Sequence, residues 1–218
     1  MRVIAGSARG RPLRSLKGHW LRPTLDRVKE AVFSSLNFQV PDARVLDLYA
    51  GSGALGIEAL SRGARSATFV DHDPQACELI RKNILSCGWA ISNDIRVTRM
   101  DVFRWLKKAE GKYDIILADP PYERGYEEAL LDLLSDRDML VTSGTLALES
   151  AARTKLPEIA GKLRLLKSRM YGDTKISYYT VGDARDTGGF TVDERDCPVS
   201  DETVSDCATR TAGARDRL

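Results

Sequence analysis

Residues 45–56 read Val-Leu-Asp-Leu-Tyr-Ala-Gly-Ser-Gly-Ala-Leu-Gly, a short apolar run followed by a glycine-rich stretch. The run predicts a buried strand, the glycines predict a tight loop, and the residues from Ala54 onward predict the start of a helix. The glycines have the GxGxxG spacing of nucleotide-binding loops, at Gly51, Gly53 and Gly56. An acid, Asp71, follows twenty positions after the first glycine. By itself, this pattern fits a dinucleotide-binding fold.

On the C-terminal side of this stretch, short β-type runs alternate with helical ones. The expected strands cover residues 44–48, 66–70, 95–99, 114–118 and 145–149, and the expected helices cover residues 54–62, 74–86, 102–108 and 125–134. Such alternation is typical of a parallel sheet with helices on both faces. Segments 163–169 and 175–181, joined by Tyr-Gly-Asp-Thr, predict an antiparallel hairpin at the edge of the sheet.

On the N-terminal side, residues 1–44 hold nine Lys or Arg and three acids. Segments 2–5 and 11–13 predict a small hairpin, and Thr24 is a good N-cap for a helix whose apolar residues follow at helical spacing. A basic segment attracts a polyanion by releasing its counterions, so this front part is a candidate nucleic-acid contact. The alternative is a basic face that is merely solvated.

Composition limits the remaining possibilities. Of the 218 residues, 43% are hydrophobic and 29% are charged, which is ordinary for a soluble globular protein. No apolar run is long enough to cross a bilayer and the start lacks the features of a secretion signal, so we expect a cytoplasmic protein. Four cysteines without a CxxC pair and two histidines predict no metal site.

Residues 183–218 hold nine acids, five arginines and few large apolar side chains. Such a segment cannot bury enough apolar surface to offset its chain entropy, so we expect a disordered acidic tail. The chain therefore divides into a basic hairpin and helix extension at residues 1–43, which is the candidate nucleic-acid contact, an α/β domain at residues 44–182, and the tail.

Asp47 distinguishes between two kinds of cofactor. It lies four residues before the first glycine, where a carboxylate would repel the pyrophosphate of a dinucleotide. The same carboxylate would suit the ammonium group of S-adenosylmethionine, and Asp71 could accept hydrogen bonds from the ribose hydroxyls of that cofactor.

The second motif is Asp119-Pro120-Pro121-Tyr122, directly after the apolar run 115–118. The prolines lack N–H donors, which leaves carbonyl and carboxylate oxygens as acceptors for an exocyclic amine, while Tyr122 could stack on the base. Bonds to Asp119 and the Pro120 carbonyl would aim the lone pair of the amine at a methyl group. A plain proline-rich turn is the alternative. The motif nevertheless follows a strand end, as Asp47 does, and open α/β sheets bind ligands there.

Over residues 2 to about 181, the chain resembles the bacterial 16S rRNA guanine-N2 methyltransferases. The resemblance is carried by the segments RVIAG, GRPL, RPTLDRVKEAVFSSL, DLYAGSGALGIEALSRGA, FVDHD, DVFRWL, ADPPY and YGDTKISYY. It implies a Rossmann-like, seven-stranded α/β methyltransferase fold with a small N-terminal extension. It also implies S-adenosylmethionine as cofactor and 16S rRNA, in the small ribosomal subunit or an assembly intermediate, as partner.

The resemblance assigns roles to individual residues. The cofactor would contact Asp47, Tyr49, Ala50, Gly51, Gly53, Gly56, Asp71, His72, Asp101 and Val102. The target guanine would contact Asp119, Pro120 and Tyr122. The basic residues and their position add a third group, which would guide the RNA: Arg9, Arg11, Arg14, Arg22, Thr24 and Arg27. Asp101 could instead simply cap a helix, and the last three residues could be ordinary helix-start residues.

These features favour a monomeric enzyme that needs no metal and transfers a methyl group to the N2 amine of a guanine. One rival is methylation of adenine N6 in DNA, although no segment is long enough to be an added DNA-reading module. A second rival is a non-catalytic RNA-binding assembly factor, in which nothing would keep Asp119 and Tyr122 in place. A nicotinamide-dependent oxidoreductase is the function that the sequence favours least.

Overall fold

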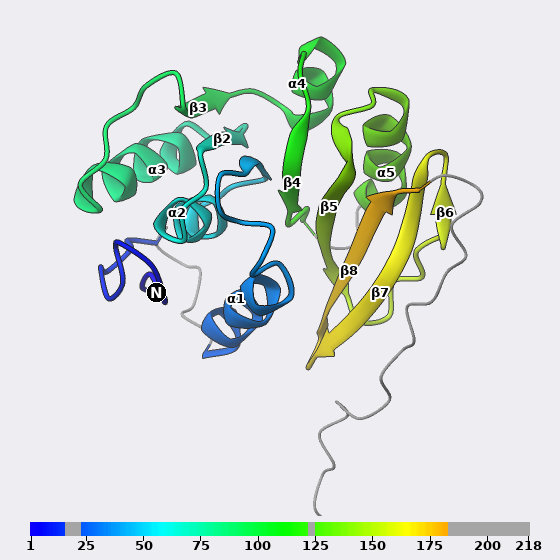
Figure 1. The fold of residues 1–218 in the computed structure, drawn as a ribbon, viewed down its shortest axis with the longest axis horizontal. Coiled ribbons are helices and arrows are strands. Elements are labelled where there is room, and N and C mark those ends of the chain that lie inside the picture. Colours follow the sequence, from blue (N-terminus) through cyan, green and yellow to red (C-terminus); the bar gives the residue numbers. More distant parts are fainter. Residues whose placement is uncertain (16–22, 122–124, 183–218) are drawn as a thin grey trace, which may run out of the picture. The chain divides into compact units, whose positions relative to one another are not determined.

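The computed structural model describes residues 1–15, 23–121 and 125–182 (Figure 1). The helices are α1 (Pro23–Ser35), α2 (Ala54–Ser61), α3 (Pro74–Ser86), α4 (Val102–Lys108) and α5 (Tyr126–Asp136). The strands are β1 (Arg44–Leu48), β2 (Ser66–Asp71), β3 (Ile95–Arg99), β4 (Tyr113–Ala118), β5 (Leu140–Ala151), β6 (Ile159–Ala160), β7 (Leu163–Tyr171) and β8 (Thr174–Val181).

All the strands belong to one sheet, in the order β3-β2-β1-β4-β5-β8-β7-β6. The first five along the chain are parallel, and β8, β7 and β6 join antiparallel at one edge. The predicted Rossmann-like α/β fold is confirmed, but the sheet has eight strands where seven were expected. The eighth is β6, whose two residues are too few to show any alternation in the sequence.

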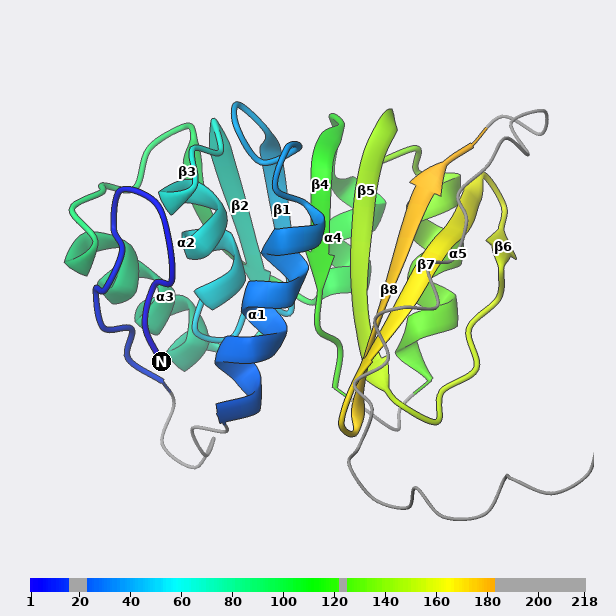
Figure 2. The ribbon, with the colours of Figure 1, turned by 60° about the horizontal axis from the view of Figure 1, so that its bottom comes forward.

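Helices cover the sheet on both faces, with α1, α2 and α3 on one side and α4 and α5 on the other (Figures 1 and 2). Successive side chains of a strand point to opposite faces, and β1 shows the result. Val45 packs with α1 residues such as Phe33, whereas Leu46 packs with α5 residues such as Leu130. Because both faces are buried, the central strands carry apolar residues on both faces rather than on one alone.

Several predicted boundaries shift. β5 begins at Leu140 rather than 145, because its first residues include polar Thr142 and Ser143, which interrupt the apolar run. The hairpin turn is Gly172-Asp173 alone, with Gly172 at a φ of 61° that favours glycine. Thr24 is not the N-cap, since α1 already begins at Pro23, a residue suited to the first turn of a helix.

The N-terminal segment, residues 1–15, forms a looser hairpin than predicted. Its two limbs share one antiparallel bridge, Arg2 to Pro12, and form no strand, because the segment bonds to α2 as well as to itself. The backbone N–H of Ser7 donates to the Ser61 carbonyl over 2.7 Å, and that of Ala8 donates to Ser61 Oγ over 2.9 Å. The described part of this segment therefore belongs to the same compact unit as the helices and the sheet.

A buried carboxylate holds this segment against the helices. Glu58 of α2 has no exposed surface and accepts hydrogen bonds from the N–H groups of Ile4 and Ala5 at 2.8 and 3.0 Å. It also forms ion pairs with Lys29 of α1 at 3.2 Å and with Arg62 at 2.9 Å. One carboxylate therefore joins the N-terminal segment, α1 and α2.

Within the described ranges, none of the helices combines the length and the apolar character that crossing a membrane requires.

Candidate active site

The glycine-rich stretch forms the predicted loop between β1 and α2. Gly53 precedes the helix with a φ of 76°, and Tyr49 has a φ of 58°, which is uncommon for a residue with a side chain. Gly56 is required for packing, because a Cβ there would lie 2.3 Å from Phe69 Cε1 on the neighbouring strand. The loop can therefore turn sharply while α2 lies close against β2.

Asp47 lies beneath this loop, near the carboxyl end of β1. It is 2% exposed, and its Oδ2 accepts a hydrogen bond from the Gly56 N–H at 2.9 Å. Burial raises the pKa of the Asp47 carboxyl to about 8, and the nearby Asp71 adds to the rise while the Gly56 bond opposes it. The group is therefore a buried acid that a neighbouring cation would stabilise in its ionised form.

Asp71, at the carboxyl end of β2, also holds the glycine loop. Its Oδ2 accepts from the Gly51 N–H at 2.8 Å, and its Oδ1 accepts from the Asp73 N–H at 2.9 Å. His72 is largely exposed, with Nδ1 3.5 Å from Asp71 Oδ1. The two acids thus hold opposite ends of the loop through hydrogen bonds, and His72 lies beside Asp71.

Asp101 is the N-cap of α4, the role that the sequence offered as the alternative to a cofactor contact. Its Oδ1 accepts a hydrogen bond from the Arg104 N–H at 3.0 Å. The Val102 side chain is buried in the core, which leaves its backbone as the part that could contact the cofactor. Asp101 also raises the pKa of Tyr49, although burial of the phenol is the larger cause. Asp101 and the loop residue Tyr49 therefore lie near each other.

An aromatic cluster adjoins these residues. The Tyr49 and Tyr126 rings are nearly parallel, with centroids 6.5 Å apart, and Phe103 meets Tyr126 edge-on at 5.6 Å. The Tyr49 hydroxyl is buried without a hydrogen-bond partner among the described residues. Flat apolar surface with an unused hydroxyl is suited to a heteroaromatic ring.

Asp119 follows β4, next to β1, and its N–H donates to the Leu48 carbonyl over 3.4 Å. The residue is exposed, so a ligand can reach it, whereas Pro120 behind it is buried. Burial of the carboxyl group raises the pKa of Asp119 well above its ordinary value, and the charges of Glu149 and Asp47 raise it further.

Three carboxyl groups are thus gathered at the ends of the adjacent strands β1, β4 and β5: Asp47, Asp119 and Glu149. Their mutual repulsion favours a bound cation or a hydrogen-bond donor that lies between them. Among the described residues, no group of three or more His, Cys, Asp or Glu has the arrangement of a metal site. The arrangement suits an organic cation and an amine.

The structure brings the predicted cofactor and guanine residues together at the carboxyl ends of the parallel strands. Tyr122 lies outside the described residues. Sequence reasoning missed Glu149, Tyr126 and Phe103. Glu149 could have been found, because it is an acid that ends the predicted strand 145–149. The two aromatic residues carried no comparable signal, since their proximity to Tyr49 depends on helix packing.

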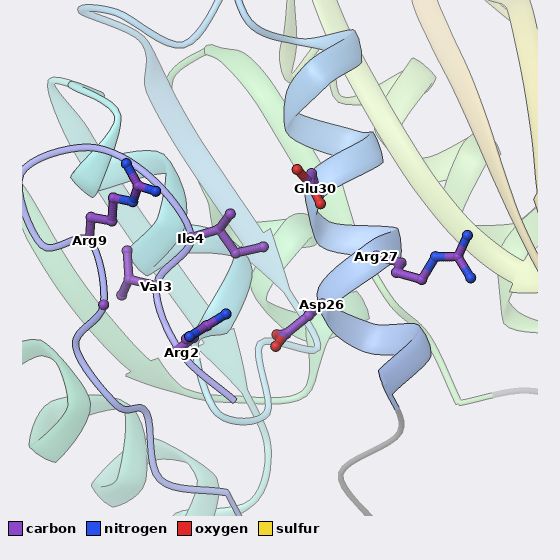
Figure 3. A pocket seen from close by; sticks show the side chains of 8 residues that line it. Arg2, Val3, Ile4, Arg9, Asp26, Arg27 and Glu30 are labelled. Atoms are coloured by element: carbon purple, nitrogen blue, oxygen red, sulfur yellow. The ribbon is translucent and has the colours of Figure 1, made fainter.

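Some predicted RNA contacts lie on the N-terminal segment and on α1 (Figure 3). Arg9, Arg11 and Arg14 are exposed, and so is Arg27 of α1. Arg22 lies outside the described residues, as does the side chain of Thr24. A cavity of about 320 Å³ lies where the segment meets α1, and its lining includes Arg2, Ile4, Arg9, Asp26, Arg27 and Glu30.

A buried amide connects the N-terminal segment to the glycine loop. Asn83 of α3 has no exposed surface, and its Nδ2 donates to the carbonyls of Arg14 and Ser52 over 3.0 and 2.9 Å. Its Oδ1 accepts from the Arg14 N–H at 2.9 Å. Through Asn83, the exposed Arg14 has a fixed place beside the predicted cofactor loop.

The model of the family described as Conserved hypothetical protein 95 matches residues 1–180. The chain belongs to this family. It is 38% identical over 182 residues to Putative rRNA methyltransferase YlbH of Bacillus subtilis, a match that covers 82% of this chain and 98% of the relative. It is 34% identical over 179 residues to Ribosomal RNA small subunit methyltransferase D of Escherichia coli K12, which covers 82% and 89% of the two chains.

A solved structure described as Putative methyltransferase yhhF from Escherichia coli has the same fold. It superposes with a TM-score of 0.74 at 34% identity, and the match covers 83% of this chain and 97% of that one. These matches confirm the resemblance to rRNA methyltransferases of the small subunit. The names of these relatives specify neither guanine nor its N2 amine.

Proposed function

We propose that this protein is a methyltransferase that transfers a methyl group from S-adenosylmethionine to the N2 amine of a guanine in 16S rRNA. The observation that carries the proposal is the set of carboxyl groups Asp47, Asp119 and Glu149, which lie beside a glycine loop at the ends of adjacent strands. The names of the relatives support the reaction class and the small-subunit RNA.

The residues present fit the cofactor. Asp47 and its acidic neighbours suit the cationic methionine part, Asp71 suits the ribose hydroxyls, and the aromatic cluster around Tyr49 suits the adenine. When bound, S-adenosylmethionine supplies an activated methyl group on a positively charged sulfur. No metal ligand set is needed for this chemistry.

The acceptor side uses Asp119 and Pro120. The Asp119 carboxylate and the Pro120 carbonyl accept hydrogen bonds from the guanine amine, which turns the lone pair on nitrogen toward the methyl carbon. The cofactor would supply the methyl carbon, and its sulfur would leave with the electron pair of the broken S–C bond as the N–C bond forms. The amine nitrogen then loses one proton, and Asp119 or water accepts it. The raised pKa of the Asp119 carboxyl suits such proton acceptance.

The specificity for the N2 amine of guanine is tested by mapping modified nucleosides in 16S rRNA with mass spectrometry. RNA from cells that lack the protein should have one N2-methylguanosine fewer than RNA from cells that contain it. In vitro, the purified full chain should restore that methyl group on small subunits from the deficient cells. Methyl on adenine N6 would favour the DNA-type rival, and unchanged RNA modification would favour a non-catalytic assembly factor. The monomeric state and the cytoplasmic location stay predictions.

A further inference from the structure

The α1-side face of the β8–β7 hairpin carries a row of cations. Arg164, Lys167 and Arg169 of β7 lie opposite Thr180, Tyr178 and Ile176 of β8. Directly opposed residues of an antiparallel pair project on the same face, and Tyr178 and Ile176 belong to the core on the α1 side. All three cations therefore share that face, and we call them the basic row.

A bulge in β7 produces this alignment. Arg164 and Lys167 are three residues apart, so in a regular strand their side chains would point to opposite faces. The register shifts between Leu165 and Lys167, and the shift turns Lys167 to the face of Arg164. The two cations on one face are thus a product of tertiary structure that the sequence pattern conceals.

The acids near the row lie outside its two strands, and Glu149 of β5 is on the same face, two strands from Arg169. Neither β7 nor β8 contains an acid, and the ion pairs found among the described residues include neither Arg164 nor Lys167. Lys167 is exposed, and its Nζ lies 5.0 Å from the centre of the Tyr178 ring. Partial burial and the charge of Arg169 lower the pKa of Lys167. A bound polyanion would relieve this repulsion between like charges.

The row leads to the candidate active site. Ala118 of β4 pairs with Leu148 of β5, so the next residues, Asp119 and Glu149, lie level with each other. Glu149 pairs with Ile176 of β8, and Ile176 pairs with Arg169 of β7. Arg169 is thus three strands from Asp119, roughly 14 Å at the usual strand spacing. Tyr178 and Ile176 of β8 are buried in the core on the α1 side, whereas Lys167 of β7 is exposed, so the open part of this face lies along β7.

Arg27 of α1 faces the same surface. The N-terminal segment lies on one side of α1, and strands β5, β8 and β7 lie on the other (Figure 2). The Arg27 guanidinium points away from Arg2 and Arg9 of that segment (Figure 3), which is the side of the strands. Cations on α1 and on β7 thus flank the open face.

We propose that the basic row of β7, together with Arg27, binds the phosphate backbone of the RNA strand on either side of the target nucleotide. The proposal rests on the proposed rRNA methyltransferase function and assigns it a second RNA-binding surface, separate from the N-terminal segment. The row positions the RNA and does not touch the reacting atoms. It acts through phosphates, without reading the bases.

The test compares the double variant Arg164→Gln/Lys167→Gln with the wild-type chain. Glutamine keeps part of the aliphatic stem that covers Tyr178, so thermal unfolding should show an intact fold. The affinity of each protein for small subunits from deficient cells is measured over a series of salt concentrations. We expect binding to weaken roughly 10-fold at about 0.1 M salt and the log–log salt slope to fall by about 1.4, as for two lost phosphate contacts.

The matched control is Lys107→Gln/Lys108→Gln, which removes the same charge from exposed residues of α4 on the other side of the sheet. The control should keep the wild-type slope, and the single-turnover rate at saturating RNA should be unchanged in both variants. If the wild-type chain methylates the RNA and the β7 variant has the wild-type salt slope, the proposal that the basic row binds RNA is wrong, while the proposed function stands. If the wild-type chain neither binds nor methylates the RNA, the proposed function fails and the basic row with it.

Discussion

At the scale of single residues, the proposed chemistry depends on the Asp119 carboxyl. Asp119→Asn keeps the size of the side chain but removes the charge that orients the amine and accepts its proton. We expect turnover to fall by about 10²- to 10³-fold, as for loss of one preorganised electrostatic partner, while cofactor affinity is retained. Single-turnover assays on undermethylated small subunits measure the effect. Asp136→Asn on the exposed surface of α5 is the control, and a near wild-type rate for Asp119→Asn would exclude this role.

Asp47 predicts a pH dependence of stability. Its pKa in the folded, cofactor-free protein is about 8, against an ordinary value of 3.8, so folding favours the protonated form. Its contribution to stability is therefore complete below about pH 4 and is lost as the pH rises to about 8. The side chain of the Asp47→Asn variant cannot ionise. The free energy of unfolding of the variant, relative to that of the wild type, should therefore increase by roughly 1–3 kcal/mol as the pH rises. Urea unfolding at about pH 5 and about pH 9 tests this, and an equal difference at both pH values would contradict it.

At the scale of elements, Glu58 ties the N-terminal segment to α1 and α2. Glu58→Ala leaves Lys29 buried without its carboxylate and removes the acceptor of two backbone N–H groups. We expect a loss of about 3–5 kcal/mol in the free energy of unfolding, as for a broken buried ion pair. Trypsin should also cut faster after Arg9 and Arg14, neither of which precedes a proline. Glu128→Ala on the exposed side of α5 is the control, and equal cleavage in both variants would count against the anchor.

At the scale of the whole molecule, the described fold should not need the tail. Both core clusters are made of residues between Val3 and Val181, and the family model ends at residue 180. A chain cut after Gly182 should therefore keep its melting temperature within about 2 °C and its cofactor affinity. Calorimetric melting and titration measure the two quantities. A loss of several degrees would mean that residues 183–218 contribute to the fold.

The proposed division into an extension, a catalytic domain and a tail also belongs to this scale. The N-terminal segment has its own basic composition, but buried Glu58, Ser61 and Asn83 tie its backbone to α2 and α3. It is therefore a part of the folded body that carries an exposed basic surface. Its role in contacting RNA stays a prediction.

The sequence by itself determined the α/β class, the parallel core of the sheet and the two strand-end motifs. These are local properties, since apolar runs, glycine spacing and prolines act on neighbouring residues. Asp47, Asp71 and Asp119 could be selected for the same reason, because each lies at or directly after a predicted strand.

Only the tertiary structure decided which distant residues meet. Glu149 joins Asp119 because β5 lies beside β4, and Tyr126 meets Tyr49 because α5 packs near the loop. The bulge that turns Lys167 to the face of Arg164, and the burial that raises the pKa of Asp47, have no signature in the order of residues. Register, burial and proximity are set by packing between elements far apart in the chain, which periodicity does not encode.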